Sequence, residues 1–179
     1  MRIVAGDLRG RRFEAPPGRD TRPTTDKVRE AVFNALGSLH LVRDAVVVDL
    51  FAGSGGMGIE ALSRGAAQAV FVERDRSALR TLRSNLSSLE LTDRARVVQG
   101  DVLVMARGLT ADLVIADPPY DFDGWIELLG VVDAPFVVAE AGHALDRLDG
   151  LAGIGWTPVR AKRYGRTWVT FLERDEPGA

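Results

Sequence analysis

The chain has 179 residues, 46% of them hydrophobic, which is enough for one compact domain with a substantial core. It holds no cysteine and only two histidines, His40 and His143, so a disulfide framework and a thiolate metal site are excluded and we expect no metal. The first residues lack an apolar signal segment and no apolar stretch is long enough to cross a bilayer, so we expect a cytoplasmic protein without membrane contact.

Charge is distributed unevenly along the chain, although the net charge is only −2. Residues 1–43 hold nine Lys or Arg against five Asp or Glu, residues 44–155 nine against seventeen, and residues 156–179 five against three. Basic ends around an acidic middle favour contact with phosphate groups. The basic side chains concerned are Arg2, Arg9, Arg11, Arg12, Arg19, Arg22, Lys27 and Arg29, with Lys162, Arg163 and Arg166 as a second group. Ordinary solvated surface has similar charge runs, so charge alone leaves nucleic-acid binding open.

The amino-terminal segment predicts a small element ahead of the main domain. Residues 2–14 alternate apolar and basic groups around the turn-prone pair that begins at Arg9, a pattern typical of a β-hairpin. Two prolines and a glycine from Pro16 onward indicate a linker. We therefore expect residues 1–20 to form a basic hairpin and linker, and residues 21–179 to form the main domain.

Downstream, helical and strand patterns alternate. Apolar residues recur with helical spacing from Thr24 or Thr25, either of which can cap a helix, to Leu36. Short apolar runs typical of buried parallel strands follow, separated by amphipathic helices. The expected strands cover residues 45–50, 69–73, 97–99, 113–116 and 136–140, the expected helices 57–64, 77–89 and 125–132, and a terminal antiparallel hairpin 156–163 and 167–173. This βαβ repetition predicts an α/β fold with a doubly wound sheet.

A glycine-rich loop follows the first strand of the sheet. Gly53, Gly55 and Gly58 satisfy the pattern G-x-G-x-x-G at the start of a helix, where backbone N–H groups can face a ligand. Glu73 ends the next strand, where a carboxylate can accept hydrogen bonds from ribose hydroxyls. These features suit a dinucleotide as well as S-adenosylmethionine, and a purely structural role in a tight turn also fits them.

Two aspartates favour a cationic ligand. Asp49, near the end of the first strand, would repel a pyrophosphate but attract a sulfonium or an ammonium group. Asp101, just after the third strand, is placed to accept from an adenine amine, with Val102 against the ring. Asp101 could equally cap the helix that follows it.

The segment Asp117-Pro-Pro-Tyr120 directly follows the fourth strand, at the edge where open α/β sheets bind ligands. An exocyclic base amine is a poor nucleophile until its lone pair is withdrawn from the ring. The Asp117 carboxylate and the Pro118 carbonyl could accept its two protons, and Pro118 and Pro119 would hold both acceptors rigidly. Tyr120 could stack on the base. A proline-rich turn with an aromatic residue is the structural alternative.

The chain resembles the RsmD-type bacterial methyltransferases, which modify the N2 amine of one guanine in 16S ribosomal RNA. The resemblance spans nearly the whole chain and is most specific in the segment from Arg22 to Asn34. It rests on RIVAG from Arg2, RGRR from Arg9, RPTTDKVREAVFN from Arg22, FAGSG from Phe51, GIEALSRGA from Gly58 and DPPY from Asp117. Tyr120 stands where some relatives have Phe, a change that preserves stacking.

The resemblance implies a class I, Rossmann-like methyltransferase fold with seven strands, the last antiparallel. By similarity, S-adenosylmethionine, which leaves as S-adenosylhomocysteine, would be lined by Asp49, Phe51, Ala52, Gly53, Ser54, Gly55, Glu73, Arg74, Asp101 and Val102. The guanine would be held by Asp117, Pro118, Pro119 and Tyr120. The RNA would contact Arg9, Arg11, Arg12, Arg22, Thr24, Lys162, Arg163 and Arg166. The expected substrate is 16S rRNA in the small ribosomal subunit or its assembly intermediate, and the expected enzyme is a monomer.

Other functions share parts of these patterns. DNA adenine and protein glutamine amide methyltransferases also favour an Asp-Pro-Pro-aromatic acceptor. A nicotinamide-dependent oxidoreductase would account for the glycine loop, but the sequence offers it no proton relay. A catalytically silent RNA-binding module is the remaining alternative.

Overall fold

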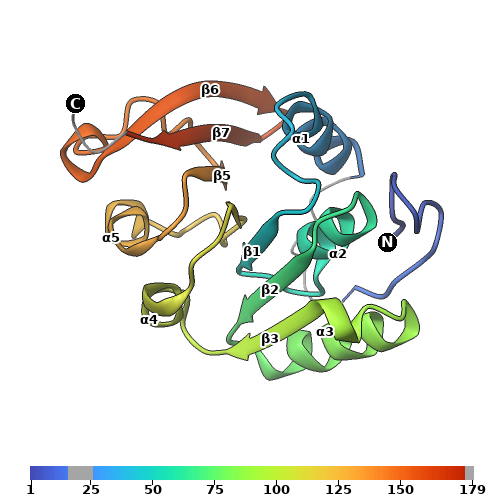
Figure 1. Ribbon diagram of the computed structural model, residues 1–179. Coiled ribbons are helices and arrows are strands. Elements are labelled where there is room, and N and C mark those ends of the chain that lie inside the picture. Colours follow the sequence, from blue (N-terminus) through green and yellow to red (C-terminus); the bar gives the residue numbers. More distant parts are fainter. Residues whose placement is uncertain (16–25, 176–179) are drawn as a thin grey trace.

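The structure is a computed structural model that describes residues 1–15 and 26–175. Its centre is a seven-stranded sheet in the order β3-β2-β1-β4-β5-β7-β6 (Figure 1). The strands are β1 (Val46–Leu50), β2 (Gln68–Glu73), β3 (Ala95–Gln99), β4 (Leu113–Ala116), β5 (Phe136–Ala141), β6 (Trp156–Tyr164) and β7 (Thr167–Arg174). Among the described strands, β7 alone runs opposite to the other six, so the predicted doubly wound sheet with an antiparallel last strand is confirmed.

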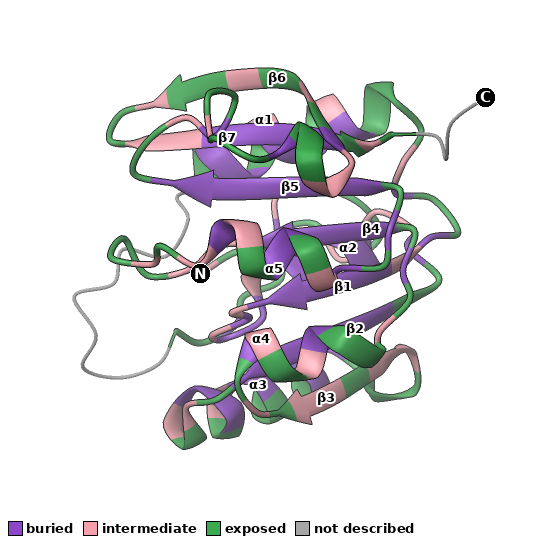
Figure 2. Cartoon of the chain, turned by 90° about the vertical axis from the view of Figure 1, so that its left-hand side faces the viewer, coloured by how far each residue is buried: buried purple, intermediate pink, exposed green. Residues whose placement is uncertain are grey.

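Helices cover both faces of the sheet, with α1, α2 and α3 on one side and α4 and α5 on the other (Figure 1). Their bounds are α1 (Asp26–Ser38), α2 (Gly56–Ser63), α3 (Arg76–Ser88), α4 (Val102–Met105) and α5 (Trp125–Val131). Every residue of β4 and β5 is buried, as expected for strands covered on both faces, whereas β6 is an exposed edge strand (Figure 2). Among the described helices, none has the length and apolar character needed to cross a bilayer.

The predicted amino-terminal hairpin is present with a single antiparallel bridge and without regular strands. One antiparallel bridge joins Arg2 and Arg12, and the chain between them forms turns rather than strands. Ile3 and Phe13 are buried in one core cluster with residues of α2 and α3, so these fifteen residues pack against the main domain. The predicted linker and the proposed boundary at residue 20 lie outside the described residues.

The strand register determines which side chains meet at the carboxyl edge of the sheet. Leu50 pairs with Val72 on one side and with Ala116 on the other. The next residues along the three strands are therefore level with one another: Phe51 after β1, Glu73 at the end of β2, and Asp117 after β4. Parallel strands thus bring the predicted cofactor loop and the predicted acceptor segment to one edge.

Candidate functional site

Three carboxylates converge at this edge, and Asp49 lies deepest among them. Only 1% of Asp49 is exposed, and its Oδ2 accepts a hydrogen bond of 2.8 Å from the backbone N–H of Gly58, in the first turn of α2. Burial raises the pKa of Asp49 from 3.8 to about 7; the Gly58 hydrogen bond opposes this rise, and the negative charges of Asp117 and Glu73 add to it. A cationic ligand would relieve this repulsion, whereas a pyrophosphate would increase it.

The three glycines of the loop have different roles. A Cβ at Gly55 would lie 2.5 Å from Leu82, and one at Gly58 would lie 2.3 Å from Phe71, so internal packing requires glycine at both positions. Gly53 has a positive φ of 56°, but a Cβ there would meet nothing nearer than 4.0 Å. Internal packing therefore explains Gly55 and Gly58, whereas the space beside Gly53 is open and can take a ligand.

Glu73 and Asp101 differ in burial and in partners. Glu73 is 6% exposed, and its carboxylate accepts from the N–H groups of Gly53 (2.8 Å) and Asp75 (2.7 Å), which joins the glycine loop to the end of β2. The Asp101 side chain is half exposed, caps α4 through the N–H of Leu103, and lies 3.7 Å from Arg74. Helix capping by Asp101, one of the two predicted roles, is therefore observed.

The segment Asp117 to Tyr120 leaves β4 as a tight, proline-fixed turn. Its entry is held by a long contact of 3.5 Å from the Asp117 N–H to the Leu50 carbonyl, and the Pro119 carbonyl accepts from Phe122 at 3.0 Å. Asp117 and Pro118 are partly exposed, while Pro119 and Tyr120 are exposed. The acceptors are thus accessible from solvent on a backbone that the two prolines keep rigid.

Two aromatic side chains to which the sequence assigned no role, Phe122 and Trp125, lie beside this turn and pack with Phe51, which was predicted to line the cofactor. Phe51 adopts a positive φ of 63°, rare for a bulky residue, and its ring packs edge-on against Phe122 at 5.1 Å. Phe122 packs in turn against the buried Trp125 at 5.2 Å. The spacing of these residues gave no periodic signal, because the contacts join two loops and a helix start.

The predicted RNA-contacting residues fall into separate environments. The Arg11 guanidinium donates to the carbonyls of Ser88 and Leu89 at the end of α3, so it also has a packing role. Arg9 lines a cavity of about 410 Å³ between the hairpin and α1, together with Lys27 and the acidic Glu30. Arg22 and Thr24 lie outside the described residues.

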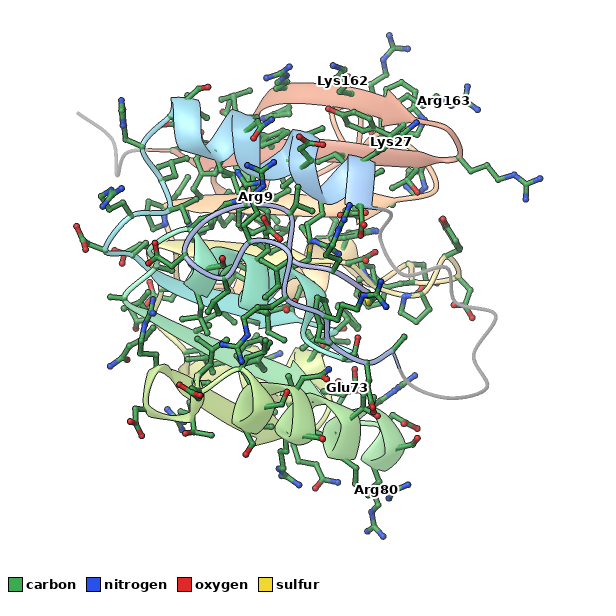
Figure 3. All side chains as sticks on the ribbon, turned by 90° about the vertical axis from the view of Figure 1, so that its right-hand side faces the viewer. Arg9, Lys27, Glu73, Arg80, Lys162 and Arg163 are labelled. Atoms are coloured by element: carbon green, nitrogen blue, oxygen red, sulfur yellow. The ribbon has the colours of Figure 1, made fainter. Side chains whose placement is uncertain are left out.

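The second basic group lies at the tip of the β6–β7 hairpin, defined here as residues 162–167. Figure 3 shows Lys162 and Arg163 near Lys27, at the start of α1. The core cluster of α1 supports this proximity, because Tyr164 packs against it. Basic residues from both ends of the chain therefore approach each other on one side of the molecule.

The family-specific segment contributes a buried ionic network. Arg29 of α1 is fully buried and pairs with Glu60 of α2 (3.3 Å) and with Asp26 (2.8 Å). Glu60 also pairs with Arg64 at 2.8 Å, and Arg64 donates to the amide of Asn34. These residues join α1 to α2, so the described part of the segment in which the resemblance is most specific has a structural role.

Glu60 also holds the amino-terminal hairpin. Its two carboxylate oxygens accept from the N–H groups of Val4 (2.9 Å) and Ala5 (3.0 Å). Gly6 then passes so close to α2 that a Cβ would lie 1.9 Å from the Ser63 carbonyl oxygen. The hairpin position is therefore set by contacts with α2.

Asn85 of α3, a further residue that the sequence reading missed, connects the hairpin to the glycine loop. It is 2% exposed; its Oδ1 accepts from the Glu14 N–H at 2.8 Å, and its Nδ2 donates to the Glu14 carbonyl (2.9 Å) and the Ser54 carbonyl (3.0 Å). One buried amide thus fixes two loops that are distant in the sequence.

Comparisons with known proteins agree on one family. A family model described as "Conserved hypothetical protein 95" matches residues 1–173. Ribosomal RNA small subunit methyltransferase D of Escherichia coli (strain K12) is 42% identical, with 99% of this chain and 92% of that protein covered. A solved Escherichia coli structure superposes with a TM-score of 0.83 at 33% identity over 98% of both chains.

A more distant structure shares the fold. An RNA methyltransferase from Salinibacter ruber, solved in complex with S-adenosyl-L-homocysteine, has a TM-score of 0.68 at 21% identity, with 88% of this chain and 97% of that chain covered.

Proposed function

The chain belongs to the conserved hypothetical protein 95 family, that of the RsmD-type rRNA methyltransferases, and from this premise we propose that it methylates the exocyclic N2 amine of a guanine in 16S rRNA. The observation that carries the proposal is the position of Asp117 to Tyr120 at the sheet edge, level with Glu73 and with the loop that follows Asp49. This arrangement supports the proposal, because two oxygen acceptors on a proline-rich turn lie at the same edge as carboxylates that suit a cation.

S-adenosylmethionine is the methyl donor, and it supplies a methyl group activated by attachment to a sulfonium sulfur. The residues present fit this cofactor, because the buried carboxylates of Asp49 and Glu73 favour a ligand with positive charge. Gly53 leaves space at the loop, and we assign the ribose hydroxyls to Glu73, whose carboxylate accepts from the Gly53 N–H. Asp101 and Val102 are the residues we assign to the adenine end, in addition to the capping contact of Asp101.

The chain's own contribution to the reaction is the orientation of the amine. The Asp117 carboxylate and the Pro118 carbonyl accept its two N–H groups, so the nitrogen lone pair is directed at the methyl carbon. As the N–C bond forms, the bond from the methyl carbon to sulfur would break and S-adenosylhomocysteine would leave. The nitrogen must then lose one proton, and we assign its acceptance to the hydrogen-bonded Asp117 carboxylate. Tyr120, 68% exposed, stacks on the unstacked base.

The RNA surface follows from charge. We assign phosphate contacts to Arg9 and Arg12 of the hairpin and to Lys162, Arg163 and Arg166 at the β6–β7 tip. The substrate is the small ribosomal subunit or its assembly intermediate, which the enzyme meets in the cytoplasm as a monomer.

The test is methyl transfer from labelled S-adenosylmethionine to 30S particles from cells that lack the enzyme, followed by mapping of the modified nucleotide. We expect label on the N2 position of one guanine of 16S rRNA, absent when unlabelled particles from the parent strain are used. Label on DNA or on a protein glutamine, but never on rRNA, would show that the acceptor segment serves a different amine.

A further inference from the structure

The hydroxyl of Tyr120 makes a side-chain contact although most of this residue is exposed. Its hydroxyl lies 3.1 Å from the Oγ1 of Thr167, in hydrogen-bond contact. Its Cδ1 lies near the backbone of Gly142, where an added Cβ would be 3.7 Å away. The hydrogen-bond contact comes from the start of β7, and the loop after β5 passes beside the ring.

Thr167 lies in a paired strand of the sheet. It opens β7, pairs with Tyr164 across the hairpin, and is followed by Trp168, which pairs with Ala141 at the end of β5. Since β5 also pairs with β4, the strand that leads into Asp117, the sheet fixes the backbone of Thr167 relative to the acceptor segment.

The same tip carries the basic residues assigned to RNA. Lys162, Arg163 and Arg166 all lie within the tip, and the Arg163 Nε donates to the carbonyl of Gly165 at 2.9 Å, which shapes the turn. A phosphate bound at the tip would therefore lie beside the residue that stacks on the base.

Resting on the proposed function, we propose that Thr167 is a positioning residue: its hydroxyl fixes the ring of Tyr120 in the orientation needed to stack on the target guanine. An exposed tyrosine otherwise rotates freely about two side-chain bonds, and stacking must then order it at the moment of binding. The β6–β7 tip thus sets the geometry of the base site as well as supplying charge.

The test compares Thr167→Val, which removes the hydroxyl, with Thr167→Ser, which keeps it, in methylation of 30S particles. Loss of one exposed hydrogen bond predicts a fall in kcat/KM for the particle of about three- to tenfold in Thr167→Val, with near wild-type activity in Thr167→Ser. Cofactor affinity by calorimetry and the urea midpoint should stay unchanged in both.

A matched control lies at the other end of the same hairpin, where the Thr157 hydroxyl donates to Asp175 at 2.6 Å on an exposed surface. Thr157→Val should retain full activity. Tyr120→Phe should reproduce the loss of Thr167→Val, and the double variant should be no worse than either single one.

Wild-type activity in Thr167→Val, or losses that multiply in the double variant, would overturn the inference. So would a Thr167→Ser variant as impaired as Thr167→Val. If the wild-type protein fails to methylate the particles at all, the proposed function fails, and this inference fails with it.

Discussion

Burial, more than a charged neighbour, controls the protonation of Asp49. With a pKa of about 7 it is partly protonated at neutral pH, although it lies where a cationic ligand is expected. Binding of a cation favours the charged carboxylate, so ligand binding and proton release are coupled at this residue.

We therefore expect S-adenosylmethionine to bind more tightly as pH rises from 5.5 to 8, and to release a proton from Asp49 on binding at the lower pH. Calorimetry in buffers of different ionisation enthalpy measures that proton directly. The Asn variant of Asp49, which keeps an oxygen acceptor for the Gly58 N–H, should bind weakly with little pH dependence. A wild-type affinity that is flat across this range would contradict the assignment of Asp49 to the cofactor.

The same pKa gives a check that needs no cofactor. The folded chain holds the Asp49 proton more tightly than the unfolded chain, so this stabilisation is complete below pH 3.8 and is lost as pH rises through about 7. Relative to Asp49→Asn, the wild-type free energy of unfolding should fall between pH 5 and 7, at no more than about 1.4 kcal/mol per pH unit. Urea unfolding of both proteins measures the difference.

Asp117 is expected to act on the transition state. Asp117→Ala should lower kcat by about 10²- to 10³-fold, the range typical of losing one polar group that stabilises a transition state, while the Kd for cofactor stays nearly the same. Single-turnover methylation and calorimetry separate the two quantities. Equal losses in both would place Asp117 in cofactor binding instead.

At the scale of elements, the amino-terminal hairpin is held mainly by α2. The sequence predicted the hairpin and its basic character, but it gave no sign that Glu60 and Ser63 receive it, because those contacts join residues more than fifty positions apart. By contrast, the seven strands and the helices α2, α3 and α5 were predicted to within two residues at each end, since buried strands and amphipathic helices have local, periodic patterns.

Two glycines of the hairpin provide a matched test of this docking. Gly6 and Gly10 have nearly equal φ values of 84° and 85°, but a Cβ at Gly6 would clash with the Ser63 carbonyl while one at Gly10 would meet nothing within 4 Å. Both alanine variants incur the left-handed backbone strain of about 1–2 kcal/mol. Gly6→Ala should be destabilised by at least about 2 kcal/mol more, measured by urea unfolding.

If the hairpin detaches before the domain unfolds, hydrogen exchange of its amides detects the change instead. Equal unfolding midpoints together with equal exchange in the two variants would show that the contact with Ser63 does not hold the hairpin.

At the scale of the whole molecule, the site is an edge where several distant segments meet. The sequence identified Asp49, Glu73 and Asp117 individually, and parallel pairing brought them together as expected. It could not identify Thr167 or Asn85, because a lone threonine or asparagine has no distinguishing pattern, and its role depends on which strand or helix lies next to it.

The basic tip should dominate the salt dependence of RNA binding. Replacing Lys162, Arg163 and Arg166 by alanine should weaken binding to 16S rRNA fragments and reduce the slope of log K against log salt by about 2, as expected when up to three phosphate contacts are lost. A matched control replaces three exposed arginines of α3 by alanine, Arg76, Arg80 and Arg83, and so removes the same charge. Figure 3 shows Arg80 far from the tip. If the slope falls only in the α3 variant, the RNA binds at α3 and not at the tip.

The buried amide of Asn85 gives the chain a means of thermodynamic linkage. It bonds the backbone of Glu14, where the basic hairpin ends, and the backbone of Ser54, inside the loop assigned to the methyl donor. A shift of either loop alters the hydrogen bonds available to the other. If RNA displaces the hairpin end, it changes the affinity for the donor, and reciprocity then requires the donor to change the affinity for RNA by the same factor.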